Sequence, residues 1–215
     1  MRWIRTRPFA FWLNLAVKAA LVGLLLFGLA SDLSQFQGKA WLGRTLAYPA
    51  VALIVPVAWA LYRLYRKRPV TYPYALDILL VLPFLIDTAG NAANLYDTVD
   101  WWDDANHFVN WALLVAAFCQ LLVRLPIGRL EGWAIAIGFG AVTAILWELA
   151  EYASFIHDSS EFATAYTDTL GDLALGLGGS VLAATVFYGL VRRPSRTAPE
   201  VPLLDDEPVL VEAED

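Results

Sequence analysis

One histidine and five acidic side chains occur at helical spacing within or beside apolar segments of the chain. Asp103, His107 and Asn110 are spaced four and then three residues apart, so they share one face of a helix. Placing an ionisable side chain in the hydrocarbon core costs on the order of 3 kcal/mol of free energy, so each such residue needs an explanation. The other acids of this set form two pairs whose members share a helical face: Glu148 and Glu151, and Asp168 and Asp172.

These residue types indicate a divalent metal site. Carboxylates that share a water-poor pocket repel one another unless they are protonated, hydrogen-bonded or paired with a cation, and we expect no arginine on this side of the molecule to neutralise them. Magnesium, calcium or manganese would do so, whereas a single histidine without a thiolate disfavours zinc. The predicted metal ligands are Glu148, Glu151, Asp168 and Asp172.

His107 has a separate predicted role. An imidazole oriented by Asp103 can act as a general base toward water or a hydroxyl group. Together with a metal that offsets phosphate charge, such a base suits displacement at phosphorus. Structural alternatives stay open: His107 could be an interhelical hydrogen-bond partner, and Asp103 and Asp168 could cap helix starts.

A further polar stripe is expected to support the same pocket. Asp87, Asn91 and Asn94 are spaced four and then three residues apart on one helical face, and we expect them to line the pocket together with Asn110. Lys18 lies inside the first apolar segment. It either snorkels toward the cytoplasm, which is the default expectation, or pairs with Asp87.

Transmembrane helices are the elements that must position these groups. The chain has 215 residues, 59% of them hydrophobic and 17% charged, which excludes an ordinary soluble domain. A helix needs about 20 apolar residues to cross the hydrocarbon core, and lipid forces each crossing segment to be helical. We therefore predict an all-α polytopic bundle over residues 1–193. Its six predicted spans are 9–30, 46–66, 74–97, 103–124, 130–155 and 168–191.

Basic residues predict the orientation. Twelve of the fifteen lysines and arginines fall at the termini and in alternate loops, which stay in the cytoplasm. Both termini are then cytoplasmic, and the polar ends of spans three to six meet on the outer side. We expect one polar pocket there, in a multi-pass protein of the plasma (inner) membrane of a prokaryotic cell. The first span could also be a cleaved signal peptide, but its length and Lys18 favour retention.

Residues 194–215 form a different region. They contain one basic and seven acidic residues together with prolines, so a disordered acidic cytoplasmic tail is expected. The rest of the chain balances 14 basic with 14 acidic residues, which excludes nucleic-acid binding through phosphate neutralisation. Cys119 is the only cysteine, so it has no partner for an internal disulfide and is expected to be a small apolar filler.

The same residues resemble a family pattern. Asp103 four residues before the His107-Phe pair, Glu148 near the end of the next span, and an Asp-x-x-x-Asp segment at 168–172 look like the VanZ-like and YjdF-like membrane proteins. The resemblance covers about residues 74–190; the VanZ-like group is linked to teicoplanin resistance, and the YjdF-like group has no characterised function. More remotely, the His and Glu-x-x-Glu arrangement is similar to base-exchange phosphatidylserine synthases, which implies a metal-dependent exchange of lipid headgroups. Where VanZ-like proteins often carry an amide, this chain has Glu151 or a second aspartate, and the extra charge favours a metal.

Three hypotheses of function follow. The leading one is a metal-dependent hydrolase or headgroup-exchange enzyme that acts on a phospholipid or a lipid-linked envelope phosphoester, with membrane lipid as its partner. The second is a proton- or cation-coupled transporter, since intramembrane carboxylates also mark ion paths, and it requires polar groups through the full membrane thickness. The third is a non-catalytic scaffold whose polar residues only hold the helices together.

Overall fold

The computed structural model describes residues 6–37, 39–67, 70–157 and 160–190. These residues form helices and connecting turns without a strand, which confirms the predicted all-α fold. The predicted tail at 194–215 lies outside the described residues. In chain order the elements are α1 (Thr6–Ala30), the 3-10 helix η1 (Ser34–Phe36), α2 (Trp41–Arg66), α3 (Tyr74–Ala92), α4 (Leu95–Thr98), α5 (Trp102–Leu122), α6 (Arg129–Glu151), the π-helix η2 (Tyr152–Ile156), the 3-10 helix η3 (Ser160–Ala163) and α7 (Ala165–Leu190).

Six of these helices are long and apolar enough to cross a membrane, as predicted: α1, α2, α3, α5, α6 and α7. Their outward faces carry large apolar side chains, such as Leu46 and Leu64 on α2 and Leu149 on α6. A soluble monomer rarely exposes apolar patches of this extent. We therefore treat these faces as the surface that contacts lipid.

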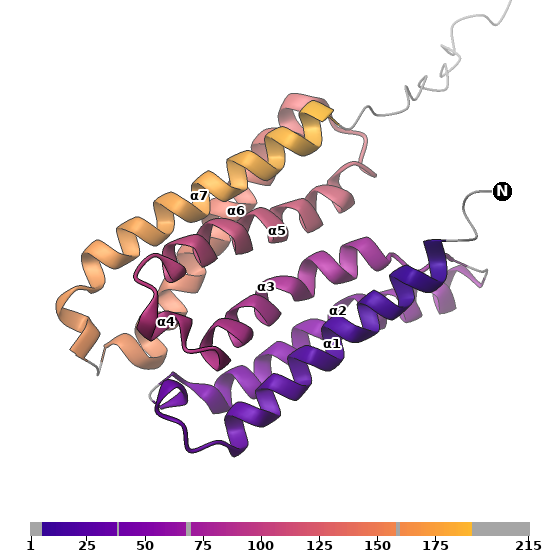
Figure 1. Cartoon of the computed structure of the whole chain (residues 1–215). Helices are drawn as coiled ribbons and strands as arrows, with labels where there is room; N and C mark the ends of the chain where they lie inside the picture. The colour runs from indigo at the N-terminus through magenta and orange to yellow at the C-terminus, as the bar shows by residue number, and fades with distance from the viewer. Residues whose placement is uncertain (1–5, 38, 68–69, 158–159, 191–215) are drawn as a thin grey trace, which may run out of the picture.

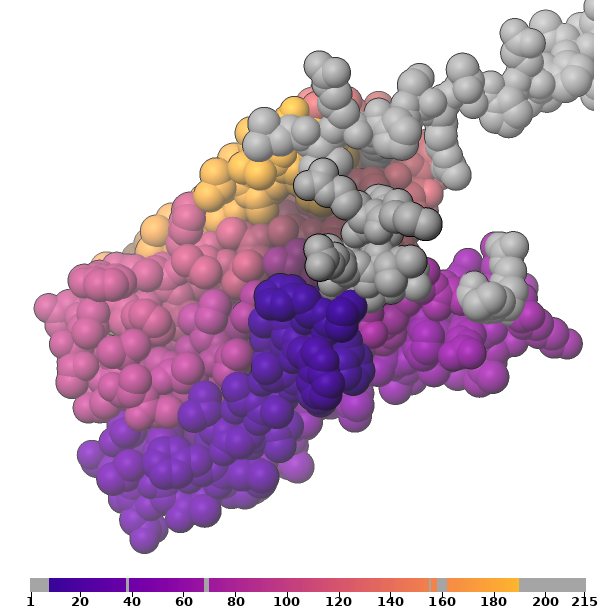
Figure 2. Space-filling model, turned by 45° about the vertical axis from the view of Figure 1, so that its right-hand side comes forward, coloured from indigo at the N-terminus to yellow at the C-terminus, as the bar shows by residue number. Residues whose placement is uncertain are grey.

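The bundle consists of two three-helix halves (Figure 1). α1 and α2 pack with α3, α6 and α7 pack with α5, and α3 and α5 form the main contact between the halves. Figure 2 shows the surface of the molecule from another side, with α7 in yellow above and α1 in indigo below. The ends of α3 and α6 and the starts of α2, α5 and α7 lie at one end of the bundle, which the distribution of basic residues predicts to be the outer side.

Glycines let α7 approach its neighbours closely. A Cβ atom at Gly179 would lie 2.0 Å from the backbone oxygen of Phe108 on α5. Likewise, a Cβ atom at Gly140 on α6 would lie 2.1 Å from Ser180 Oγ. Larger residues at these positions would push the helices apart, so Gly179 allows the close packing of α5 on α7 and Gly140 that of α6 on α7.

Two helix boundaries differ from the predicted spans and change the site. α2 begins at Trp41 and not at 46, so Arg44 lies in the first turn of a helix. Trp41 packs over Gly28 and donates from Nε1 to a backbone carbonyl of α1 at 3.0 Å, which anchors this early start. α3 ends at Ala92 and not at 97, because Asn94 adopts a left-handed conformation with φ of 59° and redirects the chain into α4.

Candidate functional site

His107 occupies the centre of the site. It lies in the second turn of α5 and is buried, with 8% of its surface exposed. Its Nε2 atom lies 3.6 Å from Asp172 Oδ1 on α7 and 3.8 Å from Asp103 Oδ1 in the preceding turn of α5. On the other side of the ring, Nδ1 lies 3.6 Å from Glu148 Oε1 on α6. Three helices thus bring one imidazole and three carboxylates together.

Little else neutralises these carboxylates. Glu148 and Asp172 are only 6% and 4% exposed, and among the described residues neither forms an ion pair with a lysine or arginine. The buried Nδ1 atom of His107 has no hydrogen-bond partner in the described part of the chain. Glu148 has a side-chain hydrogen bond with Thr169, but no cationic side chain in the described ranges offsets its charge. Burial of ionised carboxylates without a cation is costly, which favours shared protons or a bound cation.

Two overlapping triads have a spacing that suits a metal ion. Each offers three ligand atoms that lie within 4.8 Å of one another. Ligand atoms about 2.1 Å from an ion are roughly 3.0–3.4 Å apart in octahedral or tetrahedral geometry. Three of the histidine-to-carboxylate distances are 3.6–3.8 Å, so the ligand atoms would have to move closer together to hold an ion. The triads are Asp103, His107 and Asp172, and His107, Glu148 and Glu151.

The remaining predicted ligand, Asp168, lies apart from the triads. It is exposed in the first turn of α7 and belongs to neither triad, whereas Asp172, one turn further along, is buried. An acidic side chain in the first turn interacts favourably with the helix dipole. Of the four predicted ligands, three therefore lie around His107, and the position of Asp168 fits the capping alternative.

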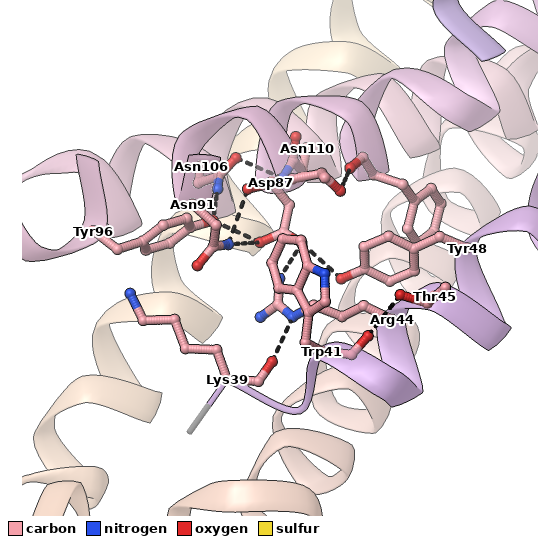
Figure 3. Close-up of polar contacts among 12 residues, drawn as sticks. Lys39, Trp41, Arg44, Thr45, Tyr48, Asp87, Asn91, Tyr96, Asn106 and Asn110 are labelled. Carbon is pink, nitrogen blue, oxygen red and sulfur yellow. Dashed lines mark hydrogen bonds and ion pairs between the residues drawn. The ribbon is translucent and has the colours of Figure 1, made fainter. Parts of the chain in front are cut away.

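A second polar network, drawn in Figure 3, lines the same cavity as His107, Asp103 and Glu151. Arg44 on α2 forms an ion pair with Asp87 on α3. Asp87 also accepts hydrogen bonds from the hydroxyl groups of Tyr48 and Tyr96, at 2.7 and 2.8 Å, and from Asn91 Nδ2 at 3.3 Å. The expectation that no arginine is available on this side is therefore wrong. Because α2 begins five residues earlier than predicted, Arg44 lies within the helix and reaches α3.

A chain of amides connects this network to α5. Asn106 donates to the Tyr96 hydroxyl group, and Asn110 Nδ2 donates to Asn106 Oδ1 at 2.7 Å. Burial and the Asp87 carboxylate raise the pKa of Tyr96 well above its usual value, so its hydroxyl group stays protonated and donates to Asp87. Sequence reasoning placed Asn110 in this region but missed Tyr48, Tyr96 and Asn106.

A cavity of about 80 Å³ joins the two networks. A water molecule needs roughly 10–15 Å³ of such space, so the cavity can hold several waters or a small polar group. Two of the predicted supporting residues, Asp87 and Asn110, line the cavity. Asn91 does not line it but donates a hydrogen bond to Asp87, and Asn94 forms the turn before α4. Its polar lining residues are Arg44, Tyr48, Asp87, Tyr96, Asp103, Asn106, His107, Asn110 and Glu151.

Lys18 belongs to a separate network at the opposite end of α3. Its Nζ atom lies 2.6 Å from Asp77 Oδ2, and Asn14 Nδ2 donates to the same oxygen at 2.9 Å. The Tyr72 hydroxyl group also donates to Asp77, and burial together with this carboxylate raises the pKa of Tyr72. The expected pairing of Lys18 with Asp87 is therefore wrong, because the ammonium group pairs with Asp77, which is fully buried in the first turn of α3.

No curated protein and no solved structure matches the chain. A family described as "Predicted membrane protein (DUF2238)" matches residues 15–193, which include both triads and the Arg44 network. The six apolar helices agree with that description. The more specific likeness to VanZ-like and YjdF-like proteins, and to phosphatidylserine synthases, stays a prediction. The chain belongs to the DUF2238 family of membrane proteins.

Proposed function

We propose that this membrane protein is a metal-dependent enzyme that hydrolyses or exchanges the phosphoester of a lipid. One observation carries the proposal: three helices place three carboxylates within 3.8 Å of the ring nitrogens of a buried histidine. A cavity that contains an arginine adjoins this cluster. A carboxylate and imidazole cluster beside a cationic group is a combination that suits chemistry on phosphate.

The proposed ligands are His107 Nε2, Asp103 and Asp172. A ligating histidine usually donates its other ring N–H to a carboxylate, which sets the orientation of the ring. Glu148 stands in that place, 3.6 Å from Nδ1. Two carboxylate ligands favour Mg²⁺, Ca²⁺ or Mn²⁺, and the imidazole favours Mn²⁺ among these three. Glu151, which lines the cavity, is then the carboxylate available to accept a proton.

Arg44 is the proposed contact for the charge of the substrate. Its guanidinium group carries five N–H donors, of which Nη1 contacts Asp87 and Nε donates to the Lys39 carbonyl at 3.0 Å. The other donors are available to an anion in the cavity that Arg44 lines. Arginine binds phosphate oxygens through charge-assisted hydrogen bonds, so a phosphoester would be oriented between Arg44 and the triads.

The proposed reaction is a displacement at phosphorus. In hydrolysis, a water oxygen forms a bond to phosphorus while its proton passes to Glu151. The bond from phosphorus to the leaving oxygen breaks, and that oxygen keeps the electron pair and takes a proton from water. In exchange, the hydroxyl group of an alcohol replaces the water. A bound divalent metal would offset the phosphate charge and lower the pKa of the attacking water.

This assignment changes four roles that the sequence suggested. Asp103 was expected to orient the imidazole and is now a proposed ligand. His107 was expected to be the base, but both of its ring nitrogens face carboxylates, which favours a ligand over a base. Glu148 was expected to be a ligand and is now proposed to orient the imidazole. Glu151 takes the role of base in place of His107.

The sequence resemblance supports the choice of substrate and location. The pattern similar to VanZ-like and YjdF-like proteins, and remotely to base-exchange phosphatidylserine synthases, favours a phosphoester. The distribution of basic residues favours a cavity on the outer side of a prokaryotic plasma membrane, where lipid headgroups are at hand. Transport has less support, because residues 78–86, which separate the Asp77 and Asp87 networks by about 15 Å of helix, are all apolar.

Metal titration of the purified protein in lipid nanodiscs tests the proposal. A ligand at 100 times its Kd stabilises the folded state by about 2.7 kcal/mol, which raises the Tm of a protein of this size by about 5–10 °C. We expect Mn²⁺ to raise the Tm by this amount in the wild type and in Asp168→Asn. In both proteins, release of the lipid headgroup should require Mn²⁺. Asp172→Asn should lose both.

Asp168→Asn is a matched control, because the same change is made one turn earlier on the same helix at an exposed carboxylate outside the triads. Equal Tm shifts in the two variants would contradict the proposed ligand set. Headgroup release that persists after chelation would contradict metal dependence.

A further inference from the structure

We infer that the lipid substrate is held by one long hydrocarbon chain, which lies in an apolar groove beside α2 and α5 while its phosphate group lies in the polar cavity. The inference deepens the proposed function and rests on it for the chemistry of the headgroup. The groove itself lies outside the triads and the two polar networks.

The groove lies toward the end of the bundle opposite the triads, between the two three-helix halves. Its volume is about 460 Å³, which falls in the usual range of roughly 300–1,000 Å³ for ligand pockets. Its walls come from α2, α3, α5 and α6, and Ala58 and Phe118 are typical lining residues. The indole of Trp59 is already used, because it donates to the Val70 carbonyl at 3.0 Å. The other polar lining residues lie at the inner mouth: Tyr62, Thr71 and Arg124.

Leu114 lines both the groove and the polar cavity, so the two hollows adjoin at this side chain. Ten residues separate Leu114 from Arg124, so the groove follows α5 for about 15 Å, which is half of a hydrocarbon core of about 30 Å. A ligand that passes Leu114 has a polar end beside Arg44 and His107 and an apolar remainder in the groove. Such a ligand is an amphiphile whose chain is long enough to pass the bilayer midplane.

A lateral opening offers this lipid a path from the bilayer. A second cavity, of about 270 Å³, lies between the outer ends of α2 and α6 and shares Arg44 and Glu151 with the polar cavity. Its rim is made of small exposed residues, including Gly43, Ala47 and Ala150. α2 and α6 belong to opposite halves of the bundle (Figure 1), and their described residues make little or no contact. A headgroup can therefore reach the site without separating packed helices.

Continuity with the polar cavity favours a lipid chain over a helix from a second copy. The groove lies at hydrocarbon depth, where acyl chains already surround the protein. A helix seated on the outside of the groove would cover its apolar walls but would make no use of the polar cavity that adjoins the groove at Leu114. A chain with a phosphate at one end uses the groove and the cavity together.

Photolabelling tests where the chain lies. The full-length protein is reconstituted in phosphatidylcholine vesicles with a hexadecyl phosphate that carries a diazirine at the chain end, then irradiated, digested and analysed by mass spectrometry. We expect adducts on residues 54–62 and 114–124. Ala58→Trp places an indole in the groove at an exposed position, so labelling of these segments should fall about tenfold. Ala134→Trp, at an exposed position of α6 that lines none of the three cavities described here, should leave labelling unchanged.

Three outcomes would overturn the inference: adducts spread evenly over the lipid-facing helices, equal labelling of the two tryptophan variants, or a dimer that Ala58→Trp dissociates. Labelling in Asp172→Asn without metal separates the inference from the proposed function. Groove labelling in a protein that never releases headgroups would support the groove and reject the enzyme. Metal-dependent headgroup release without groove labelling would support the enzyme and reject the groove.

Discussion

Loss of the Asp87 charge should destabilise the protein strongly. Asp87 is buried and accepts hydrogen bonds from Arg44, Tyr48 and Tyr96. In Asp87→Asn, one of the two acceptor oxygens becomes an amide nitrogen that faces donors, and the guanidinium group of Arg44 loses its counter-charge. Removal of one partner from a buried ion pair costs about 3–5 kcal/mol, because the other charge is left buried without compensation.

Thermal unfolding in nanodiscs, followed by tryptophan fluorescence, measures this effect. Each kcal/mol shifts the Tm of a protein of this size by about 2–4 °C, so the Tm of Asp87→Asn should fall by about 10 °C. The matched control is Asp97→Asn, which breaks an exposed pair with Lys39 at 2.9 Å. Asp97 is 47% exposed, and loss of a surface pair costs only about 0–1 kcal/mol.

A double variant identifies the cause. Arg44→Gln combined with Asp87→Asn leaves no uncompensated charge, so most of the lost stability should return. Two results would refute the reasoning: equal Tm changes in Asp87→Asn and Asp97→Asn, or a double variant whose loss is the sum of the two single losses. Either result would mean that the buried charge of Arg44 does not depend on Asp87.

Two further predictions use the same unfolding measurement. Gly179→Ala should lower the Tm by an amount equivalent to about 1–3 kcal/mol, because the added Cβ would lie 2.0 Å from the Phe108 carbonyl oxygen. Gly138 has free space around it, so Gly138→Ala should raise the free energy of unfolding by up to about 1 kcal/mol. If both substitutions changed the Tm in the same direction, the close packing of α5 on α7 would be contradicted. Lys18→Met should cost about 3–5 kcal/mol because it leaves buried Asp77 without its cation, and addition of Asp77→Asn should restore most of this loss. A Lys18→Met protein as stable as the wild type would show that Lys18 does not compensate this charge.

Helical spacing and the distribution of basic residues predict which polar helix faces lie at the same end of the bundle. Asp103 and His107 lie one turn apart on one helix, and the alternation of loops brings the end of the fifth span and the start of the sixth to the same side. These two facts place His107, Glu148 and Asp172 at the same depth, and the packing of the helices then brings the three side chains together.

The start of a helix is harder to predict, and the error at α2 hid Arg44. The hydropathy of the sequence predicts that this span begins at residue 46. Packing of Trp41 against Gly28 extends α2 by about one turn at its start, and Arg44 then reaches Asp87. The spacing of four residues between Arg44 and Tyr48 is a sequence signal that could have indicated a polar face there.

The sequence by itself determined six membrane-spanning helices and the polar face of each, because lipid leaves a long apolar segment no alternative to the helix and helical geometry sets which residues share a face. Only the tertiary structure decided which polar groups meet. Asp168 and Asp172 share a face in sequence, yet one is exposed and the other contacts His107. The rotation and depth of a helix depend on contacts between residues far apart in the chain, such as that of Gly179 with Phe108, and these contacts exist only when the helices pack.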